Sequence, residues 1–186
     1  MGFLCPICKS ATMVSAALEE GLPTERCTGC GGHWITSARY FGFLATADAH
    51  APVPENVATA PADAPGLKMC PVCLKFMHYY EVGHGLPFGI DKCNTCGGVW
   101  LNAGEWESLK AHGFMRQLHA VSSDIWQAEV EKQRRADQEE SAMRRRLGDA
   151  DYAELQRVAA WLRGHGQKVE MFAYLYQRAH TGGDKQ

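Results

Sequence analysis

Cysteine is the residue with the clearest chemical pattern in this chain. A Cys-x-x-Cys turn brings two sulfurs to one face, and two such turns supply the four tetrahedral ligands of a metal ion. Thiolates select soft or borderline metals, so the sequence predicts two four-cysteine sites that each bind one Zn2+, with iron as the alternative. All eight cysteines belong to such pairs: Cys5/Cys8, Cys27/Cys30, Cys70/Cys73 and Cys93/Cys96.

Paired cysteines also serve as disulfides or as redox dithiols. Here each pair has a second pair about twenty residues away, and no βαβ pattern surrounds any of them. Four sulfur ligands leave no position for water or substrate, which is typical of a structural metal. We find no nucleophile–base arrangement and no phosphate loop, so we expect no catalytic residues and no enzyme activity.

The cysteine pattern occurs twice. Eighteen residues separate Cys8 from Cys27, and nineteen separate Cys73 from Cys93. The flanks repeat as well, because CTGCGGHW at 27–34 corresponds to CNTCGGVW at 93–100. This self-similarity indicates a tandem duplication. The glycine pairs in both motifs suit a turn with positive φ around the sulfurs; they are Gly31, Gly32, Gly97 and Gly98.

A tryptophan follows the second cysteine pair of each copy, Trp34 in the first and Trp100 in the second. We expect these rings to pack over the metal turns. The alternative is a recognition role, in which they form a platform for stacking nucleobases. His33 lies three residues after Cys30, but its counterpart in the second copy is Val99, so we do not expect it to be a ligand.

The second copy resembles the transcription factor IIB-type zinc finger, a zinc-ribbon family. The resemblance is carried by CPVC at 70–73, IDKC at 90–93, CGGVWL at 96–101 and Gly104-Glu105. The first copy matches only through Trp34, because TSAR at 36–39 stands where the second has NAGE at 102–105. The resemblance implies two tandem zinc ribbons with the cysteines as ligands, and it suggests an association with transcription.

The remaining sequence divides the chain into four parts. Ribbon one is expected over 1–42 and ribbon two, with a short C-terminal helix, over 68–112. The Ala- and Pro-rich segment 43–67 predicts a linker that would let the ribbons move independently. Residues 113–186 predict a helical tail. The fold class expected is therefore α+β and metal-stabilised: two tandem four-cysteine zinc ribbons of short antiparallel strands, then α-helices.

Within the tail, residues 123–147 predict a long charged helix that acts as a solvated spacer. Gly164-His165-Gly166 separates two shorter amphipathic helices, the second over 167–180. These helices are expected to form a hairpin that packs on itself. The alternative is an apolar patch for a protein partner or a second copy; it would contain Met171, Phe172, Tyr174 and Tyr176.

Composition and charge narrow the function. The 186 residues are 46% hydrophobic with a net charge of −2 and no apolar run long enough to span a membrane. The first residues lack a secretory signal, so we expect the cytoplasm, where cysteines are more often metal ligands than disulfides. Residues 1–42 carry three bases and three acids, and 67–110 carry four of each. Such balance disfavours binding through phosphates.

These observations favour a non-enzymatic adaptor that recognises another protein through its ribbons or its helical tail. Nucleic acid, single-stranded rather than duplex, is the second candidate partner, and the tail offers a route to oligomers. The alternative function is a thiol-based redox or zinc sensor that releases metal on oxidation.

Overall fold

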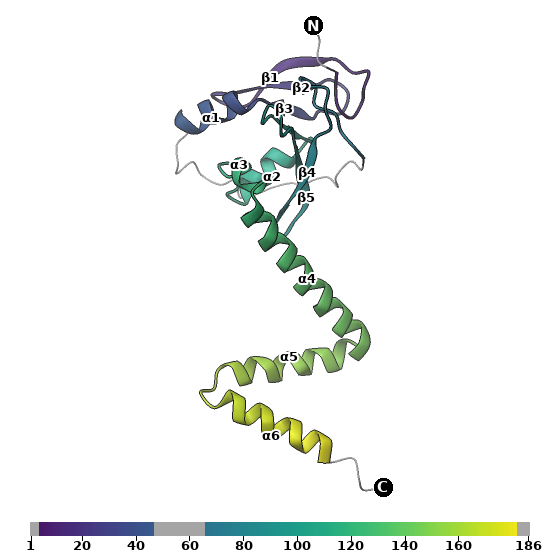
Figure 1. Cartoon of the computed structure of the whole chain (residues 1–186), viewed down its shortest axis with the longest axis vertical. Coiled ribbons are helices and arrows are strands. Elements are labelled where there is room, and N and C mark those ends of the chain that lie inside the picture. Colours follow the sequence, from purple (N-terminus) through teal and green to yellow (C-terminus); the bar gives the residue numbers. More distant parts are fainter. Residues whose placement is uncertain (1–3, 47–65, 182–186) are drawn as a thin grey trace. The chain divides into compact units, whose positions relative to one another are not determined.

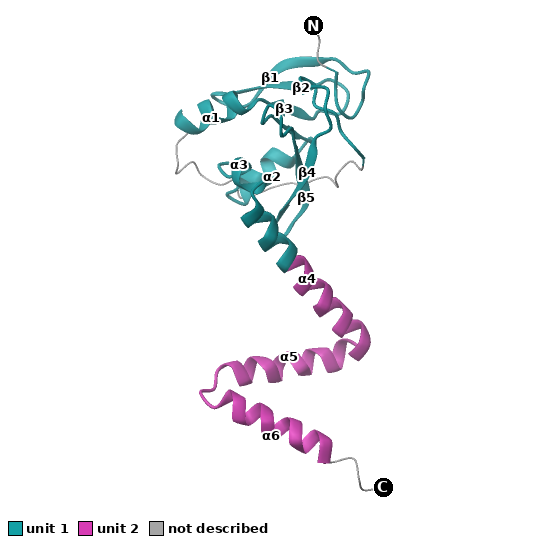
Figure 2. Ribbon diagram, viewed as in Figure 1, with its two compact units in different colours: residues 1–132 teal, residues 133–186 magenta. Residues whose placement is uncertain are grey.

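The computed structural model describes residues 4–46 and 66–181 (Figure 1). The chain forms two compact units, residues 1–132 and 133–186 (Figure 2). Most of the predicted linker, residues 47–65, lies outside the described residues. None of the described helices combines the length and hydropathy that crossing a membrane requires.

Each ribbon in unit 1 is a three-stranded antiparallel sheet, which confirms the α+β class and the short antiparallel strands. The six strands form one sheet in the order β1-β2-β3-β6-β5-β4. Ribbon one contains β1 (Met13–Glu19), β2 (Leu22–Cys27) and β3 (His33–Ile35), and ribbon two contains β4 (His78–Gly83), β5 (Leu86–Lys92) and β6 (Val99–Leu101).

The two ribbons are joined through β3 and β6, which pair antiparallel. Trp34 is opposite Trp100, and the flanking pairs are His33 with Leu101 and Ile35 with Val99. The expectation of independently moving ribbons was wrong, because the backbone hydrogen bonds of this strand pair make the ribbons one sheet. The pairing is centred on the two tryptophans, which are equivalent residues of the two copies.

The second glycine of each Cys-Gly-Gly motif is required by the tryptophan of the other ribbon. A Cβ added to Gly98 would lie 2.2 Å from Trp34 Cζ2, and one added to Gly32 would lie 2.3 Å from Trp100 Cζ2. Only the first glycine of each motif has the expected positive φ, +74° at Gly31 and +71° at Gly97. The prediction of a positive φ was therefore wrong for Gly32 and Gly98. At these two positions the absence of a side chain leaves space for the tryptophan ring of the other ribbon.

Helices cover the face of the sheet opposite the tryptophans. Side chains alternate between faces along a strand, so Ile35, Val99 and Leu101 point away from Trp34 and Trp100 and toward the helices. These helices are α1 (Ser37–Thr46), α2 (Glu105–Ala111), α3 (Leu118–Val121) and the start of α4 (Asp124–Leu147). The main buried cluster includes Leu22, Tyr40, Phe43, Val82, Phe88, Ile90, Trp106, Leu109, Leu118 and Val121.

The segment after ribbon two belongs to this core. Tyr40 Oη in α1 donates to the carbonyl of Met115 at 2.9 Å and accepts from the N–H of Leu118 at 3.1 Å. Trp126 Nε1 in α4 donates to the carbonyl of Val82 at 2.9 Å. Unit 1 therefore continues to residue 132, past the sequence-based boundary at 112.

The regular secondary structure of unit 2, over its described residues 133–181, is entirely helical. It contains the remainder of α4, followed by α5 (Asp149–Arg163) and α6 (Lys168–Thr181), and the three helices predicted for the tail are confirmed. Tyr152 is the one buried residue of α5, and α6 has none. The two helices contact each other as the hairpin prediction requires, but apolar side chains such as Leu155 and Phe172 remain exposed.

We predict that Gly98→Ala destabilises unit 1 by about 1–3 kcal/mol, the usual cost of overpacking a core. The added methyl group would displace Trp34 from its place across the β3–β6 pair. Chemical denaturation of the zinc-loaded protein measures the effect.

Gly42→Ala is the matched control, because a Cβ at this position in α1 meets no atom within 4 Å. It should be neutral or stabilising by up to ~1 kcal/mol, since alanine favours helices. Equal stability of the Gly98→Ala protein and the wild type would contradict the proposed fit of ring to glycine.

Candidate metal centres

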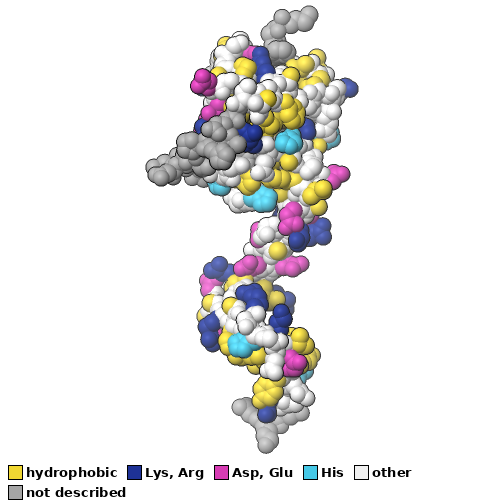
Figure 3. All heavy atoms as spheres, turned by 90° about the vertical axis from the view of Figure 1, so that its left-hand side faces the viewer, with side chains coloured by type: hydrophobic (Ala, Val, Ile, Leu, Met, Phe, Trp, Pro, Cys, Tyr) yellow, Lys and Arg dark blue, Asp and Glu magenta, His cyan; other side chains and the backbone are white. Residues whose placement is uncertain are grey.

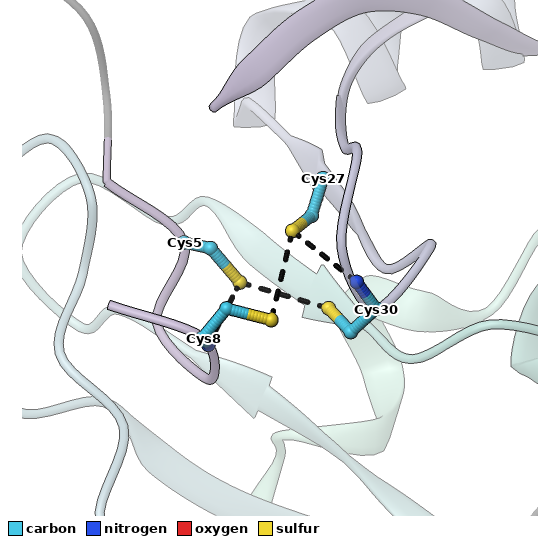
Figure 4. A group of neighbouring side chains, drawn as sticks. All are labelled: Cys5, Cys8, Cys27 and Cys30. Atoms are coloured by element: carbon cyan, nitrogen blue, oxygen red, sulfur yellow. Dashed lines mark hydrogen bonds between the residues drawn. The ribbon is translucent and has the colours of Figure 1, made fainter. Parts of the chain in front are cut away.

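The first four cysteines converge on one point. Cys5 and Cys8 lie in the turn that precedes β1, Cys27 ends β2, and Cys30 lies in the following turn. Figure 4 shows their sulfurs directed toward one another. The Cys5 and Cys30 sulfurs are 3.6 Å apart and those of Cys8 and Cys27 are 3.9 Å apart. All four ligand atoms lie within 4.8 Å of one another.

The second site repeats this geometry. The Cys70 and Cys96 sulfurs are 3.8 Å apart, and all four sulfurs again lie within 4.8 Å of one another. A tetrahedral zinc ion with Zn–S distances of about 2.3 Å places its sulfurs roughly 3.8 Å apart. Each group can therefore hold one metal ion, as two Zn2+ ions require; the second group is Cys70, Cys73, Cys93 and Cys96.

Backbone N–H groups wrap around the buried sulfurs. The amides of Ile7 and Cys8 donate to Cys5 Sγ at 3.4 and 3.3 Å. Those of Gly29 and Cys30 donate to Cys27 Sγ at 3.3 and 3.5 Å. Such hydrogen bonds stabilise the negative charge of thiolates, which is what a metal site with four cysteine ligands requires.

In each site, the first cysteine of the first pair and the first cysteine of the second pair have opposite pKa shifts. Burial raises the pKa of Cys5 to about 12, and it does the same for Cys70. Burial also acts to raise the pKa of Cys27, but backbone N–H groups and the neighbouring thiols outweigh it and lower the value to about 7. Cys93 behaves as Cys27 does. The second pair of each site thus supplies a sulfur that ionises near neutral pH.

The two tryptophans lie under the metal sites. Trp34 is 1% exposed and Trp100 is 0% exposed, and both belong to a cluster with the ligands Cys5, Cys27 and Cys70. The structure confirms the packing role. The recognition role in stacking bases was wrong, because neither ring face is accessible.

A polar network that the sequence analysis missed orients Trp100. The Trp100 indole donates to Asn102 Oδ1 at 3.1 Å. Glu105 in turn accepts from the Asn102 backbone N–H and from its side-chain amide, each at 2.8 Å. Asn102 and Glu105 therefore link the tryptophan to α2. Trp34 Nε1 is buried without a hydrogen-bond partner among the described residues, since Thr36 replaces Asn102 in the first copy.

Each ribbon also places an ion pair beside its metal turn. In ribbon two, Lys68 and Asp91 are almost fully buried and lie 2.5 Å apart. Asp91 is paired with Trp100 across the sheet, and its counterpart in ribbon one, Glu25, is paired with Trp34. Glu25 binds Arg39 of α1 at 3.1 Å, so the arginine that replaces Glu105 has its own partner.

His33 has a different role from the cysteines. Its Nδ1 lies 2.9 Å from Thr24 Oγ1, and it belongs to neither of the two ligand groups. Burial lowers the pKa of His33, and the nearby charge of Arg26 lowers it further. This histidine is a packing residue of the sheet.

We predict that the two metal centres bind zinc cooperatively. Cys8→Ser should weaken zinc binding at its own site and also at the intact second site, because loss of the first turn frees Trp34 from Gly98. Competition with a chromophoric chelator measures both affinities, and Cys73→Ser is the reciprocal variant. Wild-type affinity at the intact site in both variants would contradict this coupling.

We predict unequal costs for the two tryptophans. Trp100→Phe should lower the free energy of unfolding by about 1 kcal/mol more than Trp34→Phe, since only the former removes a hydrogen bond. The two substitutions remove the same atoms from similarly buried places, so each is the control for the other. Denaturation of the zinc-loaded proteins gives the difference, and equal costs would disprove a role for Asn102.

Comparison with known proteins agrees with this geometry. Neither a search of curated proteins nor a search of solved structures gave a significant match. The family model described as "Transcription factor zinc-finger", a TFIIB-type zinc ribbon, matches residues 4–40 and again residues 69–112. These segments contain the complete ligand sets of the two metal centres. Residues 4–40 and residues 69–112 therefore each match the transcription factor IIB-type zinc-ribbon family, one match for each metal centre.

Proposed function

We propose that this protein is a non-enzymatic recognition module that binds an apolar segment of a partner protein. The observation that carries the proposal is a groove of about 480 Å³ between the first metal turns of the two ribbons. We refer to it as the knuckle groove. Its lining includes Leu4, Pro6, Leu67, Met69, Leu74 and Phe76.

The lining of the knuckle groove is both apolar and accessible. Leu4 is 61% exposed, Leu74 is 68% exposed and Phe76 is 61% exposed. Contiguous exposed apolar surface of this kind is typical of sites that bind protein. The metal ligands Cys5 and Cys70 form the base, so the groove stands on rigid turns.

Backbone strain occurs at two positions of the groove. Lys9 and Leu74, each the residue after the first cysteine pair of its ribbon, have positive φ values of 59° and 55°. Glycine would adopt this conformation without steric cost, whereas a leucine there is strained. The presence of side chains rather than glycine at these two strained positions of the groove supports a binding role for them.

Charge indicates what the partner segment contains. Among the described residues that line the groove, Lys9 is the one with a charged side chain. An apolar segment with an acidic residue beside it would match this surface. The buried tryptophans and the balanced charge of the ribbons support a protein ligand over nucleic acid.

The chemistry of the site supports the remaining features of the proposal. Four sulfurs around each ion leave no coordination position for a substrate, which favours a structural metal and a protein that is not an enzyme. Unpaired thiols fit a reducing compartment, and we propose the cytoplasm. We also propose a role associated with transcription, because the matching family is described as a transcription factor zinc-finger.

We predict that Leu74→Gly separates binding from folding. The substitution relieves the positive φ, so stability should be unchanged or slightly raised, whereas the groove loses an exposed contact. The probe is a peptide selected from a displayed random library against the zinc-loaded protein. Its affinity, measured by fluorescence anisotropy, should fall at least about tenfold, as for loss of an apolar anchor.

Ile125→Ala is the control, because Ile125 is 86% exposed on α4 and does not line the groove. It should leave the affinity unchanged. Labelled single-stranded DNA, RNA and duplex DNA are measured in parallel over a salt series. Micromolar nucleic-acid binding that weakens steeply with salt, together with selected peptides indifferent to Leu74→Gly, would refute the proposal.

The sensor function is the second candidate, and exposure of one ligand favours it. Cys96 is exposed, whereas its counterpart Cys30 is only partly exposed, so the second site offers an oxidant easier access. Zinc release is followed with a chromophoric chelator during addition of hydrogen peroxide. An adaptor retains both ions at stoichiometric peroxide, and a sensor loses the ion of the second site first.

A further inference from the structure

We propose that the α5–α6 hairpin binds a second copy of itself in an antiparallel arrangement, which makes the protein a dimer through a four-helix bundle. The starting point is that the hairpin lacks a core. Among its described residues only Tyr152 is buried, and it is held by α4 through a 2.6 Å hydrogen bond to Glu140. Two helices with so little burial need a further surface to pack against.

The apolar side chains of the hairpin gather on one side. A groove of about 530 Å³ runs between α5 and α6. Leu155 and Leu162 line it from α5, and Phe172 and Leu175 line it from α6. Leu155 is 46% exposed, Phe172 is 62% exposed and Leu175 is 41% exposed. On the face drawn in Figure 3, the helical unit likewise shows hydrophobic side chains among charged ones.

The charged residues near the two ends of this groove favour a second copy of the hairpin as the binding partner. Asp151 precedes Leu155 by one helical turn, so it lies on the same face of α5 just beyond the residues that line the groove. Arg163 and Lys168 line the groove at the opposite end, where α5 leads into α6. On this side of α5, the start of the helix therefore carries an acidic residue, and the opposite end of the groove carries two basic residues.

This polarity is self-complementary. A second hairpin related by a two-fold axis across the groove would place its basic end on Asp151 and its acidic end on Arg163 and Lys168. The described helices of the hairpin carry four acids and four bases, so two copies meet without net repulsion. Antiparallel helices packed around an apolar centre are the geometry of a four-helix bundle.

The experiment is sedimentation equilibrium on the full-length, zinc-loaded protein at concentrations up to roughly 100 µM, where a dissociation constant in the micromolar range is measurable. We expect the mass of two chains. Phe172→Glu should give a monomer that retains two zinc ions per chain. Tyr174→Glu is the matched control, since Tyr174 is 57% exposed on the same helix but does not line the groove; it should remain a dimer.

A charge exchange tests the antiparallel arrangement apart from the folding of the hairpin. Asp151→Lys alone should weaken dimerisation several-fold, and so should Arg163→Glu with Lys168→Glu. The triple variant should recover the wild-type dimer. A monomeric wild type, a dimer that survives Phe172→Glu, or a triple variant no better than its parents would each overturn the proposal.

Discussion

The exchange of tryptophan rings between the two ribbons is the interaction on which the rest of the molecule depends. Trp34 occupies the space that Gly98 leaves, and Trp100 occupies the space that Gly32 leaves. Both rings lie beside the metal ligands, and their strands are the central pair of the sheet. We therefore expect metal binding, pairing of β3 with β6 and burial of the two tryptophan rings to be coupled during folding. A single ribbon would lack the glycine against which its own tryptophan packs.

The two faces of the sheet have different tasks. One face carries the tryptophans and the metal turns, and its burial comes from cysteine, glycine and indole. The other face carries aliphatic residues under four helices and forms an ordinary apolar core. Because the helical face encloses residues from both ribbons, it stabilises the same pairing that the metal face creates. This division leaves the outer surface of the metal turns free to carry exposed leucines.

Local spacing predicted the metal ligands, because ligation depends on residues that are close in sequence. The β3–β6 pairing was not predictable, since strands of three residues carry too little alternation to indicate a partner. The glycine pairs show the same limit: positive φ is a local property, whereas room for a ring from the other copy is not. Leu118 and Val121 lie in a helix of four residues, which is too short to show a helical periodicity, so only tertiary packing shows that they belong to the core.

The contacts at the centre of the sheet, between β3 and β6, are symmetric. The contacts across it are reciprocal: each copy gives a ring and receives one, and the flanking residues exchange in the same way. Two separate ribbons of identical sequence would meet through the same symmetric surface. The duplicated chain therefore contains, within one polypeptide, a pseudo-symmetric interface of the kind that joins the two subunits of a homodimer. The symmetry is not exact, because the residues near the two tryptophans differ, with asparagine in one copy and threonine in the other.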